Sequence, residues 1–351
     1  MKMGEFQESL RELLDSAERL PLDLESRIVI LSDLHLGDGS AGDDFLRNEQ
    51  YVLAALRSWY LPRGYLLVLN GDIEDLQKAA YPRILASHKE FYSLLDAFAA
   101  EGLLRKILGN HDLGLLLSRD LRHPVVHAIC LEWRGRSFLV YHGHQASKFF
   151  VRYNYLSRFV VRYLANPLRL KNVDIPMTSR RRFRAERRIY RASRALGIVS
   201  VTGHTHRPLF ESLSKYDTLR YKLEDLIRRY AEALEADRAG IAELAGVYDA
   251  EMKRLDGKER GKRSQSLYET EDTVLPYLFN SGCATGVRGF TALEIGGGSI
   301  RLSYWADGRD KRPYVDLEAS EREALEGTTW VRYVLKEDRL DYVTSRIDLL
   351  R

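Results

Sequence analysis

The sequence predicts an α/β (α+β) protein, because apolar strand-like runs alternate with amphipathic helical segments. Five apolar runs each end in a short loop that combines Gly with Asp, Asn or His; they cover residues 27–38, 65–72, 105–112, 137–144 and 197–208. Helical spacing of apolar residues marks the intervening segments 43–57 and 84–100. Strands and helices in alternation build layered folds whose ligands bind at the carboxyl ends of the strands.

The first run places an acid and a histidine directly after a strand. Residues 28–31 are apolar and predict a buried strand, and Asp33 and His35 follow it. Because side chains alternate along an extended chain, we expect both to project on the same side as the strand ends. A carboxylate and an imidazole that converge in this way suit a divalent cation.

The later runs repeat this arrangement. In each of them a glycine lets the backbone turn sharply beside the polar residues. The candidate side chains are Asp72 after Gly71, then Asn110, His111 and Asp112 after Gly109, then His142 and His144 on either side of Gly143, and finally His204 and His206 after Gly203. Five such units in this order predict a single metal-binding edge.

The ordered blocks resemble those of the calcineurin-like metallophosphoesterase superfamily: Asp-x-His, Gly-Asp, Gly-Asn-His-Asp, His-Gly and Gly-His-x-His. The resemblance covers roughly residues 27–210 and a strand pair near 279–305. It implies a β-sandwich of two mixed sheets flanked by helices, with two divalent metal ions at one edge. It also implies hydrolysis of a phosphomonoester, phosphodiester or pyrophosphate bond by a hydroxide shared between the two ions.

The resemblance assigns a role to each residue. Asp72 would bridge the two cations, and His111 would reach the substrate phosphate or leaving oxygen, oriented by Asp112. The remaining metal ligands would be Asp33, His35 and His206 for one ion, and Asn110, His142 and His204 for the other. His144 could be a substrate contact, a neighbour that supports the ligands, or the ligand in place of His142. Mn²⁺ is the expected metal, and Fe, Zn²⁺ and Mg²⁺ are also compatible.

Other polar residues near the blocks are expected to have no part in the site. The acids Asp38, Asp43, Asp44 and Asp75 are predicted to be solvated loop residues. The histidines outside the blocks, namely His88, His123 and His127, are predicted to be structural or surface residues. Cys130 and Cys283 are predicted to be buried thiols rather than a disulfide.

The domain organisation follows from the blocks and the helical patterns. We expect an N-terminal helical segment at 1–24, with the helix over 4–20, a catalytic domain at 25–310 and a C-terminal extension at 311–351. Two insertions interrupt the domain. Segment 145–196 is basic, aromatic and helical and should lie over the site as a lid. Segment 214–272 is a charged helical hairpin that turns near Gly240 and is either solvated or an oligomer contact. The oligomeric state is left open.

Charge is distributed unevenly. Residues 145–194 hold fourteen Lys and Arg against two acids, a net charge of +12, so the rest of a chain whose total is +4 carries −8. UDP-2,3-diacylglucosamine hydrolases share a basic and aromatic insertion before Gly-His-Thr-His-Arg-Pro. That likeness implies a phosphorylated small-molecule or lipid-linked substrate and contact with an anionic membrane. Two features differ, since those enzymes have Arg at the position of His111 and lack an insertion like 214–263.

Three alternative interpretations remain. The basic block with interleaved aromatics could bind nucleic acid, as in a nuclease. The site could belong to a protein phosphatase, or the arginines could pair with acids elsewhere in the chain. No apolar run approaches eighteen residues and the N-terminus has no apolar signal region, which predicts a cytoplasmic protein with peripheral contact at the inner membrane face.

Overall fold

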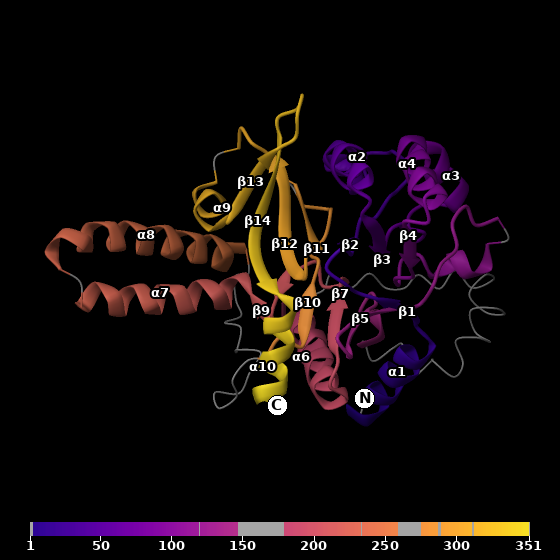
Figure 1. Cartoon of the computed structure of the whole chain (residues 1–351). Helices are drawn as coiled ribbons and strands as arrows, with labels where there is room; N and C mark the ends of the chain where they lie inside the picture. Colours follow the sequence, from indigo (N-terminus) through magenta and orange to yellow (C-terminus); the bar gives the residue numbers. More distant parts are fainter. Residues whose placement is uncertain are drawn as a thin grey trace.

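Two mixed β-sheets form the centre of the protein (Figure 1). The computed structural model describes residues 3–118, 120–146, 179–232, 234–258, 275–286, 289–310 and 312–350. The first sheet has the order β1 (Glu18–Pro21), β5 (Ile129–Trp133), β6 (Arg136–Val140), β7 (Val199–Thr202), β10 (Leu278–Asn280), β8 (Leu209–Phe210) and β9 (Leu213–Ser214). The second has the order β13 (Glu321–Ala324), β14 (Trp330–Arg339), β12 (Ser299–Asp307), β11 (Phe290–Gly296), β2 (Arg27–Leu31), β3 (Leu66–Asn70) and β4 (Leu104–Ile107).

Strand β2 illustrates how the layers form. Ile28 and Ile30 face the first sheet and join a core cluster between the two sheets. Val29 and Leu31 point the other way, into a cluster with helices α2 (Glu49–Ala55) and α4 (Lys89–Ala100). A strand that is buried on both faces is apolar throughout, as this one is. The predicted α/β class with two mixed sheets flanked by helices is therefore confirmed.

The outer face of the first sheet is covered by α1 (Met3–Ser16) and α6 (Ser179–Leu196). Phe6 and Leu10 of α1 share a buried cluster with Ala185 and Ile189 of α6. The predicted basic helix is thus present, and its apolar face packs as a layer on the sheet. Residues 147–178 of the predicted lid lie outside the described residues.

Several predicted helix limits were wrong. The N-terminal helix ends at Ser16, and β1 follows where helix was expected, because its backbone pairs in parallel with β5. The helix expected at 84–100 is divided at His88 into α3 (Tyr81–Ser87) and α4. The one expected at 43–57 becomes η1 (Phe45–Arg47), α2 and η2 (Leu56–Tyr60), followed by η3 (Leu61–Arg63).

The segment predicted as a C-terminal extension is part of the second sheet. After α9 (Pro313–Glu318), strand β13 pairs with β14, and β14 pairs with β12 along its length. This pairing covers an edge of β12 that would otherwise expose unpaired backbone groups. Helix α10 (Leu340–Leu350) then packs Val343 and Ile347 into the core between the sheets.

The charged insertion is a hairpin of α7 (Lys215–Glu232) and α8 (Glu235–Lys258), which projects away from the sheets (Figure 1). The predicted turn near Gly240 was wrong, because Gly240 lies inside α8 and the chain reverses before α8 begins at Glu235. A glycine costs an exposed helix only about 1 kcal/mol relative to alanine, and helix–helix packing can offset that. In the second sheet a tight turn joins β11 to β12, since Gly296 pairs with Ser299.

Candidate active site

The strand topology brings the five sequence blocks to one edge. β2, β3 and β4 are neighbouring parallel strands of the second sheet, and β6, β7 and β10 are neighbouring parallel strands of the first. Their carboxyl ends carry the loops that hold the candidate ligands. The loops also bond to one another, since Asp33 N donates to Gly71 O at 3.0 Å and Gly203 N donates to His142 O at 2.9 Å.

Left-handed backbone conformations, rather than the alternation of side chains along a strand, set the directions of the ligand side chains. β2 ends at Leu31, before the first of them. Positive φ angles occur at five candidate ligands: Asp33 (55°), His35 (54°), Asp72 (52°), His204 (64°) and His206 (56°). Such angles are uncommon outside glycine and cluster at functional sites, where the surrounding structure holds them. The reason given above for the common direction of Asp33 and His35 was therefore wrong, although the two side chains do converge.

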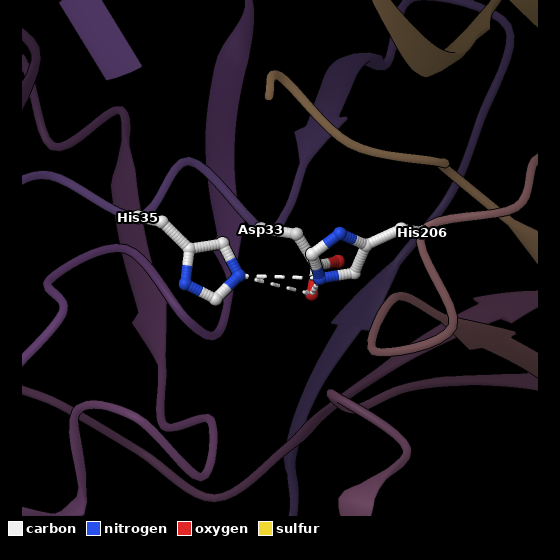
Figure 2. Close-up of side chains that lie close together, drawn as sticks. All are labelled: Asp33, His35 and His206. Atoms are coloured by element: carbon white, nitrogen blue, oxygen red, sulfur yellow. Dashed lines mark hydrogen bonds and ion pairs between the residues drawn. The ribbon is translucent and has the colours of Figure 1, made fainter. Parts of the chain in front are cut away.

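The first group of ligands consists of Asp33, His35 and His206. Figure 2 shows both imidazoles directed at the carboxylate of Asp33. His206 Nε2 lies 3.1 Å from Asp33 Oδ1, and His35 Nε2 lies 4.0 Å from the same oxygen. The two Nε2 atoms are 3.2 Å apart. Two ring nitrogens and a carboxylate oxygen that face one another form a site for a cation.

The second group consists of Asp72, His142 and His204. His142 Nδ1 lies 2.9 Å from the carbonyl oxygen of Asn70, so this nitrogen carries a proton, and in the neutral imidazole Nε2 would hold the lone pair for a cation. His142 Nε2 lies 3.1 Å from Asp72 Oδ2 and 3.9 Å from Asp33 Oδ1. The second distance joins this group to the first, so the two groups are adjacent.

Two buried polar atoms support a metal site. Asn110 Oδ1 and His204 Nε2 are both shielded from solvent and have no hydrogen-bond partner among the described residues. Leaving such atoms unsatisfied costs about 1–3 kcal/mol each in a folded protein. Both are donor atoms that divalent cations accept, so the residues fit a bound metal.

The electrostatics of the site favour the ligating form at some residues and the protonated form at others. Burial would raise the pKa of Asp33, but His206 and His142 outweigh it and lower this pKa to about 2. Burial lowers the pKa of His35 to about 4 and, together with His142, that of His204 to about 3. The carboxylate is therefore charged and these two imidazoles are neutral at pH 7, which are the forms that bind metal. Burial would lower the pKa of His142 and of His206, but the neighbouring carboxylates outweigh it, so the pKa of His142 rises to about 9 and that of His206 rises well above its usual value. A cation that binds these last two imidazoles would displace their protons.

Two glycines allow the loops to approach this closely. A Cβ added to Gly109 would lie 2.1 Å from Asp72 Oδ1, and one added to Gly203 would lie 2.6 Å from Asp33 Oδ2. Either contact would push a ligand out of position. The Gly-Asn-His-Asp and Gly-His-x-His blocks thus need glycine for space at these positions as well as for the turn.

His111 is held by Asp75, which is buried rather than solvated as predicted. Its Nδ1 lies 3.0 Å from Asp75 Oδ1, and its Nε2 lies 4.0 Å from Asp72 Oδ2. The prediction that Asp112 orients the ring was wrong, because the carboxylate of Asp112 accepts the backbone N–H groups of Gly109 (2.6 Å) and Ile73 (2.9 Å). Burial, with the charges on Asp72 and Glu74, raises the pKa of Asp112 to about 7.

The other acids and histidines have varied surroundings. Asp43 is buried rather than solvated, and its carboxylate lies 2.8 Å from His88 Nε2. Asp38 is exposed and Asp44 is half-buried. His88 and His123 have structural carboxylate partners, as their predicted role requires. His144 is buried, and its ring centroid lies 5.4 Å from that of His142. Of these two histidines, His142 is the one that belongs to the second ligand group. Cys130 and Cys283 are free thiols, the first buried and the second half-buried.

Comparisons with known proteins give a likeness of fold. No protein-family model and no curated protein matches the sequence. Among solved structures, a single mutant of Vps29 from Entamoeba histolytica is 13% identical with a TM-score of 0.33, covering 81% of this chain and 93% of its own. A conserved uncharacterized protein from Streptococcus pneumoniae, described as a predicted phosphoesterase, is 10% identical with a TM-score of 0.30, covering 83% and 95%. At these values neither likeness bears on the chemistry, which rests on the geometry above.

Within the described ranges, none of the helices combines the length and apolar character that crossing a membrane requires.

Proposed function

We propose that the protein is a metal-dependent phosphoesterase with a two-ion site, which hydrolyses a phosphomonoester, phosphodiester or pyrophosphate bond. The observation that carries this proposal is that the two ligand groups are adjacent. The distance between Asp33 Oδ1 of the first group and His142 Nε2 of the second is 3.9 Å. Asp33, His35 and His206 would hold one ion, and His142, His204 and Asn110 the other. Asp72 would serve both, and Mn²⁺ is the expected metal, with Fe, Zn²⁺ and Mg²⁺ as alternatives.

Bound divalent cations would supply Lewis-acid activation of the phosphoryl group and of the attacking water. The protein supplies the remaining chemistry. Since a carboxylate can only accept, the hydrogen bond to Asp75 places a proton on His111 Nδ1 and turns Nε2 towards the ligand groups. From there Nε2 can donate a hydrogen bond or a proton to the leaving oxygen. In this role His111 is a catalytic residue and Asp75 a positioning residue.

Asp75→Asn is expected to lower kcat about 10–100-fold with little change in KM, since residues that orient catalytic groups typically contribute that much. The measurement is steady-state hydrolysis of the best substrate, together with the metal content of the purified variant. Unchanged metal content would distinguish positioning from loss of a ligand. Asp38→Asn, an exposed acid in the loop that follows β2, is the matched control and should keep parental kcat. An Asp75 variant with parental kcat contradicts the role.

We further propose an amphiphilic, anionic substrate, such as a nucleotide-linked or other phosphorylated lipid. Two observations support this. Leu116 and Leu117 of η4 (Leu113–Leu117), directly after Asp112, are 45% and 38% exposed. Arg188 of the basic helix α6 donates to the carbonyl of Ala146 in η5 (His144–Ala146), beside the site. Exposed leucines at a phosphate-binding edge and nearby guanidinium groups suit an acyl chain joined to a phosphate.

The test of the function is a substrate panel in buffer with Mn²⁺. It includes p-nitrophenyl phosphate, its bis ester, cyclic nucleotides, a phosphopeptide and UDP-linked lipids. We expect hydrolysis of at least one compound, its loss after chelation and dialysis, and its return on adding Mn²⁺. Turnover that survives complete metal removal contradicts the proposal, as does the absence of turnover on every compound with any of the four metals.

Binding experiments separate the alternatives for the partner. Retention on vesicles that contain anionic lipid, with none on single-stranded DNA or RNA, supports the amphiphilic substrate. Salt-sensitive retention on single-stranded nucleic acid without vesicle binding would favour a nuclease instead. Cleavage of the phosphopeptide alone would favour a protein phosphatase.

A further inference from the structure

The outer half of the α7–α8 hairpin exposes an apolar stripe along α7. Ile227 is 58% exposed, Tyr230 is 43% exposed, and Leu234, which follows in the turn, is 76% exposed. Leu223, half-buried, precedes them on the same side of the helix. These four residues form the α7 stripe. A helix in water normally buries such a stripe against another element.

The base of the hairpin is anchored and the outer half is not. Leu219, Leu226 and Tyr248 are buried in a cluster with Tyr314 of α9 and residues of β14. At the same place Lys222 Nζ donates to Glu318 at 2.6 Å and Tyr248 donates to it at 2.7 Å. Between 227 and 247, by contrast, none of the residues whose burial is described is buried.

The hairpin has the length and the exposed apolar surface of one half of a four-helix bundle. α7 and α8 contain 18 and 24 residues, or about 27 and 36 Å of helix. On the α8 side, Ile241, Leu244 and Ala245 are only partly buried. Four-helix bundles are completed when two such hairpins pack their apolar faces together. The projecting position in Figure 1 leaves room for a second hairpin to approach.

The pattern of the α7 stripe is symmetric. Its spacings of four, three and four residues, at 223, 227, 230 and 234, are the same in both chain directions. An antiparallel copy of α7 would therefore place residue 230 opposite 227 and residue 234 opposite 223. Self-complementarity of this kind is what a twofold interface requires.

The charge of the hairpin also favours a second copy over an anionic or cationic partner. Within 215–232 and 235–258 there are nine Lys and Arg and ten Asp and Glu. This balance contrasts with the +12 of residues 145–194, so the hairpin neither attracts polyanions nor repels its own copy strongly. We infer that the α7 stripe is a homodimer interface, in which two hairpins pack antiparallel into a four-helix bundle.

The inference is tested by sedimentation of the full chain over a wide range of protein concentrations. We expect a species of twice the 40.5 kDa chain mass. The double variant Ile227→Asp, Leu234→Asp should raise the dimer dissociation constant at least about tenfold, because residues buried at the centre of an interface contribute most of the binding energy. Tyr221→Asp is the matched control, since Tyr221 is 45% exposed but lies on the other side of α7, and it should leave the dimer intact.

Disulfides between two copies test whether the two α7 helices pack antiparallel, with residue 230 of one opposite residue 227 of the other. The pair Ile227→Cys, Tyr230→Cys should cross-link two copies on oxidation, while Tyr221→Cys should give no more cross-linking than the parent with its own Cys130 and Cys283. Circular dichroism checks that each variant keeps its helices. A parent chain that is monomeric at every concentration, or a dimer that the Ile227 and Leu234 changes leave unaltered, overturns the inference. The result is independent of the proposed chemistry.

Discussion

Replacing Asp72 with Ala is expected to reduce hydrolysis at least about 10³-fold on whichever compound the parent cleaves. Asp72 is buried, lies 3.1 Å from His142 Nε2 and accepts the backbone N–H of His111 at 2.7 Å. It therefore contacts both the second ligand group and the loop 109–112, which carries His111. Its loss would remove the shared ligand, and several kcal/mol of transition-state stabilisation correspond to that rate effect.

The experiment measures kcat/KM and bound metal for Asp72→Ala and Asp72→Asn. The Asn variant can still accept the His111 N–H, so it separates loss of the charge from loosening of the 109–112 loop. Both variants should bind less metal than the parent, whereas Asp38→Ala should match it in metal content and turnover. Undiminished hydrolysis by the Asp72 variants would remove this residue from the site.

Replacing His88 with Ala is expected to lower the free energy of unfolding by about 3–5 kcal/mol, the usual cost of leaving a buried charge unpaired. The side chain of His88 is fully buried between Asp43 and Glu49, with ring nitrogens 2.8 Å from a carboxylate oxygen of each. His88 also lies at the junction between α3 and α4. Urea unfolding gives the change, and His127→Ala, at an exposed histidine, should change it by less than about 0.5 kcal/mol.

The effect of His88 should depend on pH in a defined direction. Burial alone would lower the pKa of this imidazole, but the hydrogen bonds to Asp43 and Glu49 raise it to about 9. Because the folded pKa exceeds the unfolded value of about 6.5, the contribution of protonated His88 is complete below pH 6.5 and is lost as pH rises through 9. The difference between parent and variant should shrink over this interval. A constant difference would show that His88 contributes by packing alone.

The sequence was informative where local chemistry determines structure. Apolar runs that end in Gly with Asp, Asn or His predicted β2, β3, β4, β6 and β7 and the edge where their loops meet. Strand β1 could not be predicted in this way. Its four residues, Glu18–Pro21, have no apolar alternation, and they are extended because β5 offers them a parallel partner.

Asp75 was missed for a similar reason. In the sequence it is one more acid in a loop, three residues after Asp72. In the fold, Asp75 N donates to the Leu36 carbonyl at 2.9 Å, and this long-range contact turns its carboxylate towards His111. The signal that could have found it is an acid within one turn of the Gly-Asp block, but solvated loops contain such acids so often that spacing alone does not identify it.

The left-handed backbone at Asp33, His35, Asp72, His204 and His206 also limits how this site can vary. Apart from glycine, the residue types that accept such angles most readily are Asn, Asp and His. The same three types are good donors to divalent cations. Exchanges among them can therefore alter the preferred metal without rebuilding a loop, whereas a branched or bulky residue at any of the five positions would disturb the backbone before it affected coordination.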